Sequence, residues 1–213
     1  MVHKILDDLV QFLYIKTYRR FIEKSVHSGD RVLDVGSGSG FLKPLIESQG
    51  GFYCGIEPRT LVFDDAVARY GPDGFHNTLL LSNSGELEYD KVICLTVLDE
   101  VADKLEFIEV IKSYSNVNSV FFFSVRNSAF PLRKSKQVYS TVDGTAVTDL
   151  SFDEWNSLFE RYGFDIIKTE KLGRPPVTAF SIVGLKSFLL YLIFYVLPKR
   201  KSYMLLFSLK LSS

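Results

Sequence analysis

The sequence predicts a doubly wound α/β fold, in which a mostly parallel sheet carries helices on both faces. Short apolar runs alternate with amphipathic stretches along most of the chain, and a glycine-rich turn directly follows the first run. The runs are continuously apolar, which is typical of parallel strands buried on both faces. The chain has 213 residues, of which 46% are hydrophobic and 23% charged. We therefore expect one large domain over residues 1–213.

The first half of the chain alternates between predicted strands and helices. Apolar positions at helical spacing over residues 4–27 predict an N-terminal helical cover, which we assign to 1–27. The elements that follow are strand 31–35, the glycine turn 36–40, an amphipathic stretch from Phe41, strand 51–56, helix 61–70, a short third strand Leu79–Leu81 and strand 90–96. This order is that of repeated strand–helix units.

The second half continues the alternation and adds two inserted segments. Its predicted elements are helix 104–114, strand 119–125, a hairpin within 137–147, helix 152–162, strand 164–170 and a β-prone run at 202–211. Asp143-Gly144 supplies the hairpin turn, and Ser151 with Glu154 forms a capping box. We assign residues 126–150 to a cover loop with the hairpin and 173–201 to an apolar insertion between the last two strands.

The charge is balanced overall but unevenly distributed. Lys and Arg number 25, and Asp and Glu also number 25. Residues 1–167 carry 17 basic and 24 acidic side chains, a net of −7, and residues 168–213 carry 8 basic side chains and only Glu170, a net of +7. Without bulk basicity, and with no basic recognition domain, we expect no nucleic-acid partner.

Cysteine and histidine usage predicts neither a disulfide scaffold nor a metal centre. Cys54 and Cys94 form no C-x-x-C pair and have no histidine cluster near them, so we expect two packing thiols in a reducing compartment. The three histidines are scattered, and we expect surface positions for them. The N-terminus lacks the apolar stretch and cleavage site of a signal peptide, so we expect a cytoplasmic protein.

The segment Val32-Leu33-Asp34-Val35-Gly36-Ser37-Gly38-Ser39-Gly40 carries most of the chemical information, together with Glu57 seventeen residues later. Glycines in a strand-to-helix turn let the backbone approach a ligand closely, and a carboxylate ending the second strand can accept hydrogen bonds from ribose hydroxyls. A dinucleotide site of the form G-x-G-x-x-G would place its third glycine at Phe41, so the sequence disfavours a dehydrogenase.

This G-x-G-x-G turn, with an acid two positions before it, resembles the S-adenosylmethionine site of the seven-stranded class I methyltransferases. The segment Tyr89–Val101 is similar to the fourth-strand segment F-D-x-V-x-x-x-x-V-L-E-H-V of the ubiquinone and menaquinone methyltransferases. Residues 151–164 resemble the helix that precedes strand six in that group. Together these matches cover about residues 25–172.

The resemblance implies a seven-stranded sheet whose last strand is antiparallel, and S-adenosylmethionine as cofactor. The residues implied to bind the cofactor are Asp34, Gly36, Ser37, Gly38, Gly40, Glu57, Pro58, Asn83, Ser84 and Leu95. Asp99 and Glu100 are the implied catalytic pair, although Glu100 stands where many relatives have histidine. The implied reaction is in-line methyl transfer to a small-molecule or lipid-linked acceptor, without a metal. A non-catalytic binding or membrane-associated partner protein with the same fold is the alternative.

Four features of the sequence each allow more than one interpretation. Asp34 either contacts the ligand or holds the glycine-loop amides, and Asp99 with Glu100 either acts in catalysis or interacts with a helix dipole. The basic side chains Arg126, Arg133, Lys134 and Lys136 form either a solvated loop or a site for an anionic acceptor group. The segment 179–201, too short in its charge-free part to span a bilayer, is a covering helix, a membrane or lipid contact, or an oligomer interface.

Overall fold

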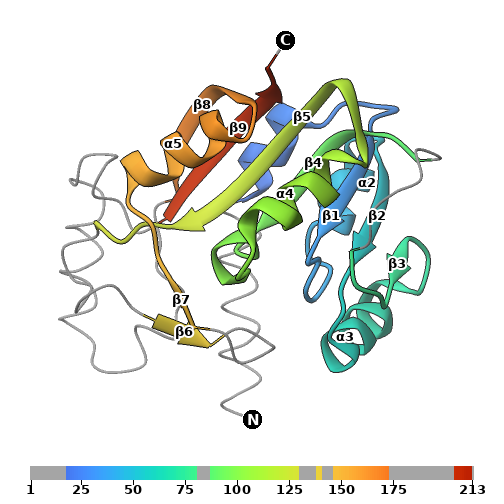
Figure 1. Cartoon of the computed structure of the whole chain (residues 1–213). Coiled ribbons are helices and arrows are strands. Elements are labelled where there is room, and N and C mark those ends of the chain that lie inside the picture. The colour runs from blue at the N-terminus through green and yellow to red at the C-terminus, as the bar shows by residue number, and fades with distance from the viewer. Residues whose placement is uncertain (1–17, 81–86, 130–137, 141–145, 173–203, 213) are drawn as a thin grey trace, which may run out of the picture.

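A seven-stranded sheet forms the centre of the computed structural model, which describes residues 18–80, 87–129, 138–140, 146–172 and 204–212 (Figure 1). The strands are β1 (Arg31–Val35), β2 (Phe52–Ile56), β3 (Phe75–His76), β4 (Tyr89–Leu95), β5 (Ser115–Arg126), β8 (Phe164–Leu172) and β9 (Met204–Leu211). Their order is β3-β2-β1-β4-β5-β9-β8. Strand β9 pairs antiparallel with both β5 and β8, and the pairs among β1 to β5 are parallel. The predicted fold class and the antiparallel last strand are confirmed.

Strand β1 shows why the runs are continuously apolar. Val32 packs into the core on one face of the sheet, whereas Leu33 and Val35 pack into the core on the other, and all three are buried. Successive side chains of a strand point to opposite faces. A strand covered on both faces therefore needs apolar residues at nearly every position.

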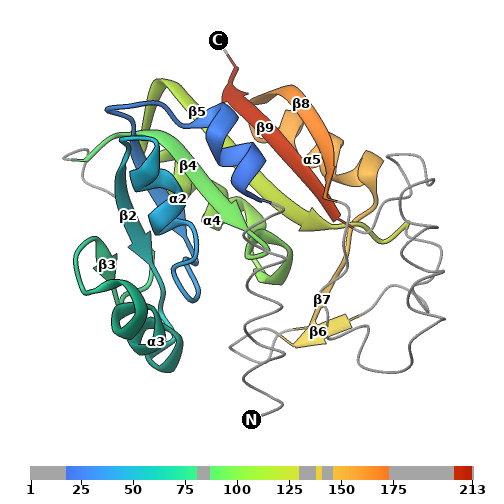
Figure 2. The ribbon, with the colours of Figure 1, turned by 180° about the vertical axis from the view of Figure 1, so that it is seen from behind.

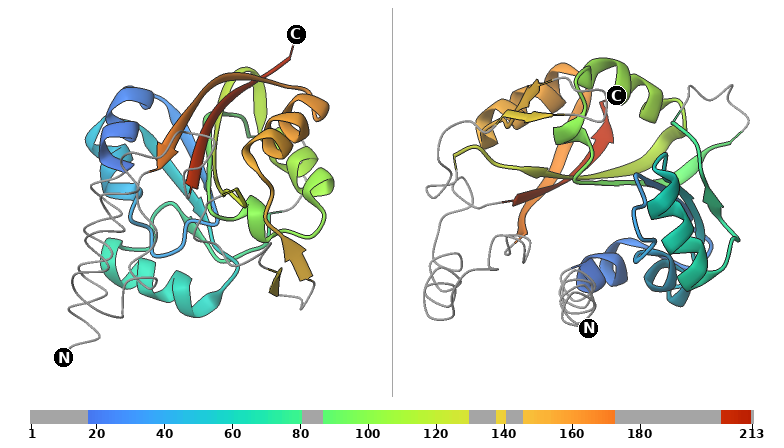
Figure 3. Two further views of the ribbon diagram at one scale, coloured as in Figure 1. Left: turned by 90° about the vertical axis from the view of Figure 1, so that its left-hand side faces the viewer. Right: turned by 90° about the horizontal axis from the view of Figure 1, so that it is seen from below.

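Helices form a layer on each face of the sheet. The helical residues 18–25, α2 (Lys43–Ser48) and α3 (Thr60–Tyr70) share one core cluster, and α4 (Lys104–Lys112) and α5 (Phe152–Arg161) share the other. Figure 2, seen from behind, shows the first group, and the right-hand view of Figure 3 shows the two layers on either side of the curved sheet. Residues 1–17 of the predicted helical cover lie outside the described residues.

The third strand differs from the prediction. Leu79–Leu81 was the expected strand, but β3 is Phe75–His76, which pairs with Gly55 and Ile56. The Gly55 N–H donates to the carbonyl of Gly74 at 2.7 Å, and Gly74 takes a positive φ of 75° as the chain closes on β2. Leu79 is 66% exposed. Leu79 and Leu80 line a cavity instead, and Leu81 lies outside the described residues.

The cover hairpin and the capped helix follow the predictions. Strands β6 (Val138–Ser140) and β7 (Ala146–Thr148) pair antiparallel beyond the carboxyl end of β5, and β7 contacts the 3₁₀ turn η1 (Leu98–Glu100) (Figure 1). Ser151 and Glu154 form the full capping box of α5. The hairpin's Asp143-Gly144 turn and the insertion 173–201 fall outside the described residues.

Three smaller findings bear on the sequence predictions. Cys54 and Cys94 are free thiols, the first partly and the second fully buried. His27 and His76 are exposed, and His3 lies outside the described part of the chain. Among the residues that the structure describes, no helix is long and apolar enough to cross a bilayer.

Candidate functional site

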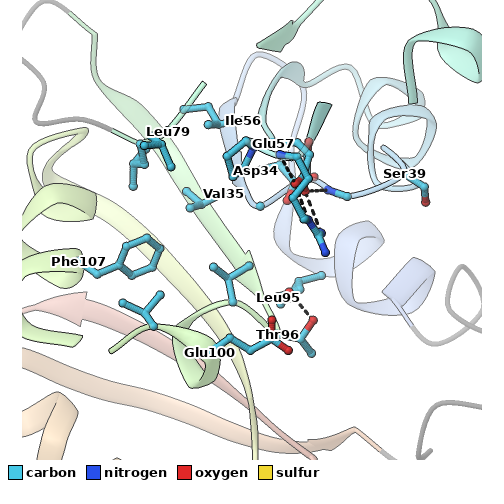
Figure 4. Close-up of a pocket in the computed structure, with 18 of the residues that line it drawn as sticks. Asp34, Val35, Ser39, Ile56, Glu57, Leu79, Leu95, Thr96, Glu100 and Phe107 are labelled. Atoms are coloured by element: carbon cyan, nitrogen blue, oxygen red, sulfur yellow. Dashed lines mark hydrogen bonds and ion pairs between the residues drawn. The ribbon is translucent and has the colours of Figure 1, made fainter. Parts of the chain in front are cut away.

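A cavity of about 1200 Å³ opens where β1, β2 and β4 end (Figure 4). Its walls come from the glycine turn, from Glu57 to Arg59 after β2, from two charged residues of α3, and from the segments 79–80, 95–97 and 100–102. The carboxyl ends of parallel strands meet at one edge of the sheet, which is where ligands of doubly wound folds bind. The predicted cofactor and catalytic segments therefore converge on one space.

The glycine turn is anchored to β2 by its backbone. The N–H groups of Gly36 and Ser37 both donate to the carbonyl of Ile56, at 2.8 and 3.0 Å. Gly36, Gly38 and Gly40 all take positive φ angles, of 69°, 56° and 73°. Residues other than glycine rarely adopt positive φ angles. The three glycines therefore stand at the positions where the backbone of the turn requires them.

The three glycines differ in what surrounds them. A Cβ on Gly36 would lie 2.3 Å from Cγ2 of Val97, and one on Gly40 would lie 2.5 Å from the ring of Phe75. A Cβ on Gly38 would meet nothing within 4 Å. Gly36 and Gly38 line the cavity, whereas Gly40 does not and is a packing glycine. Only at Gly38 does the missing side chain leave space open to a ligand.

Glu57 is a buried carboxylate at the end of β2, with 1% of its surface exposed. It accepts hydrogen bonds from the N–H of Gly38 at 3.0 Å and from the N–H of Arg59 at 3.0 Å. The Arg59 side chain adds two more, from Nε at 2.8 Å and Nη2 at 3.2 Å. Burial raises the pKa of Glu57, but the bonds from Arg59 and Gly38 outweigh it and the pKa lies below its usual value. The carboxylate is held charged at the cavity wall.

Asp34 lies on the cavity floor, 2% exposed, and accepts a hydrogen bond from the Tyr53 hydroxyl at 3.0 Å. Burial raises the pKa of Asp34 to about 7, against a lowering by the Tyr53 hydrogen bond, and the charge of Glu57 raises it further. This carboxyl is thus poised to change its protonation state near neutral pH. Its hydrogen bond joins it to a side chain of β2.

The apolar wall of the cavity is built by residues that the sequence assigned elsewhere. Leu79, Leu80, Val97 and Phe107 all line the cavity, and the predicted residues Pro58 and Leu95 lie there too. Asn83 and Ser84, the implied adenine contacts, fall outside the described residues. Thr96, after β4, has a positive φ of 59° and its N–H donates to the carbonyl of Ser124 at 3.0 Å.

The two implied catalytic acids are placed differently. Glu100 lines the cavity, with its side chain 52% exposed and its Oε1 3.2 Å from Nη1 of Arg126. Asp99 is fully buried, is absent from the cavity lining and forms an ion pair with Nε of Arg126. Burial raises the pKa of Asp99, and the Arg126 charge lowers it in part. Arg126 also lies 3.3 Å from Oδ1 of the buried Asp149.

Arg126 is therefore bound by carboxylates, and it is not a solvated loop residue. Its side chain is 13% exposed, and its carbonyl accepts a hydrogen bond from Nε1 of Trp155 at 2.9 Å. It joins the end of β5 to η1 and to the segment before α5. Arg133, Lys134 and Lys136 fall outside the described residues. Within the described ranges, no set of three or more His, Cys, Asp or Glu side chains is grouped to hold a metal ion.

Residues 8–169 match the model of a family described as a methyltransferase domain. This region covers well over half of the chain. The chain belongs to the methyltransferase domain family. The family predicted from the sequence is confirmed.

Known proteins of this kind resemble the chain in sequence and in fold. The ubiquinone biosynthesis O-methyltransferase of Pasteurella multocida is 30% identical over 115 residues, covering 47% of this chain and 48% of the relative. The chain thus matches about half the length of that curated relative. A Listeria monocytogenes protein described as a candidate S-adenosylmethionine-dependent methyltransferase superposes with a TM-score of 0.68, at 16% identity, over 94% of this chain and 99% of its own.

A third protein is a Burkholderia thailandensis 1,6-didemethyltoxoflavin-N1-methyltransferase, solved with bound 1,6-didemethyltoxoflavin and S-adenosylhomocysteine. It superposes with a TM-score of 0.63 at 15% identity, over 92% of this chain and 78% of that one. At such identities these structures establish the fold of this methyltransferase domain.

Three features of the methyltransferase site were not predicted from the sequence. Arg59 binds Glu57, Tyr53 binds Asp34, and Arg126 gathers the acids around Asp99. Arg59 is only two positions from Glu57 in the sequence, so their ion pair could have been predicted from the sequence. The other two join residues 19 and 27 positions apart. They depend on strand register, which the motifs alone do not reveal.

Proposed function

We propose that this chain transfers the methyl group of S-adenosylmethionine to a small-molecule acceptor and leaves S-adenosylhomocysteine. The observation that carries the proposal is the pairing of an open glycine, Gly38, with a buried charged carboxylate, Glu57, across one cavity wall. The sulfonium is an activated methyl donor, so the protein's main task is alignment. Orientation of this kind can contribute ~7 to 11 kcal/mol.

The residues fit this cofactor. Gly38 leaves room for a ligand to lie against the turn, and Glu57 has the acceptors that ribose hydroxyls require. The apolar wall around Leu79 and Leu80 suits a flat ring. Phe41 stands where a dinucleotide motif needs glycine, lines the cavity and packs against Tyr18 with ring centroids 5.6 Å apart. A nicotinamide dinucleotide therefore fits less well.

For a hydroxyl acceptor, we infer that Glu100 accepts the proton. It alone of the two acids lines the cavity, and its carboxylate is half exposed. Asp99 forms a buried ion pair with Arg126, so its role is to hold η1 in place. A general base must come within hydrogen-bond reach of the proton that it removes, and Glu100 is the acid whose position permits this. An amine acceptor that is neutral at working pH needs no such base.

Calorimetry with S-adenosylhomocysteine and with NAD tests the cofactor assignment. We expect binding of the first and no comparable binding of the second. Glu57→Gln should weaken binding of S-adenosylhomocysteine markedly, since a hydrogen bond to a charged group contributes ~1.5 to 3 kcal/mol. Glu47→Gln, which alters an exposed acid paired with Lys43, is the matched control. Equal affinity of wild type and Glu57→Gln would remove Glu57 from the site.

A lipid-linked acceptor and contact with a membrane surface through residues 179–201 remain part of the proposal. They are supported by the apolar run at 179–197, the adjacent Lys199-Arg200-Lys201 and the net charge of +7 over residues 168–213. Each basic residue near an anionic surface adds ~1 kcal/mol, screened by salt. We expect co-sedimentation with phosphatidylserine vesicles at low salt, lost on neutralising the three basic residues. Protein that stays in the supernatant would favour a soluble acceptor.

The alternative function is that of a non-catalytic partner with a methyltransferase fold. A chain that does not bind the cofactor would need neither Gly38, a positive-φ glycine open to the cavity, nor Glu57, a buried charged acid beside it. Incubation with labelled S-adenosylmethionine and a panel of phenols, amines and carboxylates separates the two functions. Binding without transfer to any acceptor class, including lipid extracts, would favour the partner.

A further inference from the structure

A buried carboxyl and a phenol meet beneath the glycine turn, where the proposed reaction gives the phenol no role. Asp34 on β1 is 2% exposed and Tyr53 on β2 is 9% exposed, and the hydroxyl donates to Oδ2 at 3.0 Å. In the parallel register, Asp34 lies opposite Gly55. Tyr53 is two residues before Gly55 and so shares its face of the sheet, from which its long side chain extends to Asp34.

Gly55 leaves the space through which the phenol extends. A Cβ at this position would lie 2.3 Å from the Tyr53 hydroxyl oxygen. Glycine weakens a strand interior, and it is often found where another group approaches the backbone closely. The ring is held from its other side by Phe75, in edge contact at 5.2 Å between centroids. The position of the hydroxyl is therefore set by packing before any ligand arrives.

Among the residues that the structure describes, the groups that shift the pKa of Asp34 include no cation. The groups that shift its pKa are the Tyr53 hydroxyl, which lowers it, and the Glu57 carboxylate, which raises it. The thiols of Cys54 on β2 and Cys94 on β4 are close enough to be influenced by its charge, and burial raises the pKa of both, so they stay neutral. A buried carboxylate in such surroundings is costly unless a cationic group of a ligand approaches it.

We propose that Tyr53 is a positioning residue of the cofactor site, which keeps the Asp34 carboxylate ionised and turned toward the cavity to receive the ammonium group of the cofactor's amino-acid end. This inference rests on the proposed function. Asp34 lines the cavity beside the open glycine, whereas Tyr53 does not line it. The phenol thus acts on the ligand only through Asp34. Affinity for a ligand that carries an ammonium group should rise with pH as Asp34 ionises.

The test compares wild type with Tyr53→Phe, using S-adenosylhomocysteine as the probe. Loss of the hydrogen bond should raise the pKa of Asp34 by about one, which is a tenfold change in protonation. We expect about tenfold weaker binding at about pH 6 and less than twofold weaker binding at about pH 8.5. At each pH the ligand has the same protonation state for both proteins. Its own titration therefore does not affect the ratio of the two affinities.

Two further variants separate this role from loss of packing. Gly55→Ala keeps the phenol but displaces its hydroxyl, and its Cβ would also lie 3.0 Å from Cβ of Ser37 in the glycine turn. The part of its loss of affinity that depends on pH should therefore match that of Tyr53→Phe. Tyr89→Phe removes the hydroxyl of another buried tyrosine of the same sheet, one that pairs with Cys54. The affinity of Tyr89→Phe for S-adenosylhomocysteine should equal that of wild type at both pH values. Carbon NMR titration of the Asp34 carboxyl in the ligand-free protein gives a readout that does not depend on binding.

The outcomes decide between the proposals. A loss of affinity in Tyr53→Phe that is equal at both pH values, with an unchanged Asp34 titration, would overturn the positioning role and indicate packing only. If wild-type protein binds no S-adenosylhomocysteine at either pH, the proposed cofactor is wrong. The ligand-free titration then decides the Tyr53 contact by itself, because an unshifted Asp34 midpoint in Tyr53→Phe contradicts it.

Discussion

The guanidinium of Arg59 contacts both carboxylate oxygens of Glu57, with Nε 2.8 Å from Oε1 and Nη2 3.2 Å from Oε2. Two backbone N–H groups, of Gly38 and of Arg59 itself, complete the set. A carboxylate offers about four acceptor sites. Ribose hydroxyls therefore reach Glu57 only where the Arg59 side chain gives way, and that side chain is 56% exposed.

Replacing Arg59 should strengthen cofactor binding. A partly exposed ion pair is worth ~0 to 1 kcal/mol, so we expect Arg59→Met to bind S-adenosylhomocysteine up to about fivefold more tightly in calorimetry. Arg69→Met is the control, because Arg69 also lines the cavity but pairs with Asp65 on the same helix. Weaker binding by Arg59→Met alone would mean that Arg59 contacts the ligand directly.

A methyl group at Gly38 should block the ligand while sparing the fold. Nothing lies within 4 Å of its Cβ position, so Gly38→Ala should cost only ~1 to 2 kcal/mol of unfolding free energy for the left-handed φ. Gly29→Ala is the control, because Gly29 also takes a positive φ, of 90°, has nothing within 4 Å of its Cβ position and lies in an exposed turn before β1. Urea denaturation should show similar losses of unfolding free energy for the two variants. Calorimetry should show lost binding only for Gly38→Ala. Retained binding would place the ligand elsewhere.

The stability of the ligand-free protein should reveal the charge of Asp34. Its pKa rises from 3.8 to about 7 on folding. The folded state thus binds the extra proton between these values, and stability falls as pH rises from about 4 to about 7. Asp34→Asn cannot ionise, so its advantage over wild type should grow across that window to at most ~4 kcal/mol and then level off. A difference independent of pH, measured by urea denaturation, would contradict this.

Arg126 should matter for stability more than any exposed cation. Arg126→Met leaves Asp99 buried without its ion-pair partner, a change that typically costs ~3 to 5 kcal/mol. The loss should be smaller at pH 5 than at pH 8, because burial raises the pKa of Asp99 and acid favours its neutral form. Lys168→Met, which removes an exposed pair with Glu170, should cost less than ~1 kcal/mol. Equal losses for both variants would show that the buried cluster adds little.

The elements that are local in sequence were predictable. Strand β1, its glycine turn and Glu57 lie within 27 residues and follow from apolar runs and turn chemistry. The capping box of α5 was equally local. Strand β3 was misplaced because two residues, Phe75 and His76, carry no periodicity, while the apolar Leu79–Leu81 does resemble a strand.

The long-range contacts of the site were not predictable from residue types. Asp99 and Glu100 are adjacent in sequence, yet one is buried and the other is exposed in the cavity wall. Both acids pair with Arg126, 26 residues beyond Glu100 at the end of β5, but only Asp99 is fully buried. Only the pairing of β4 with β5 brings these positions together. Charge alone could not tell a buried ion pair from a reactive acid.

The register between β8 and β9 has a consequence for how such chains can diversify. Leu172 and Met204 are direct partners, and Met204 also pairs with Arg126 at the end of β5. The two ends of the chain segment between β8 and β9 therefore lie side by side, next to the end of β5. The entropy of closing a loop grows only slowly with its length. The chain between these two strands can therefore differ greatly in length among such proteins without any change to the sheet.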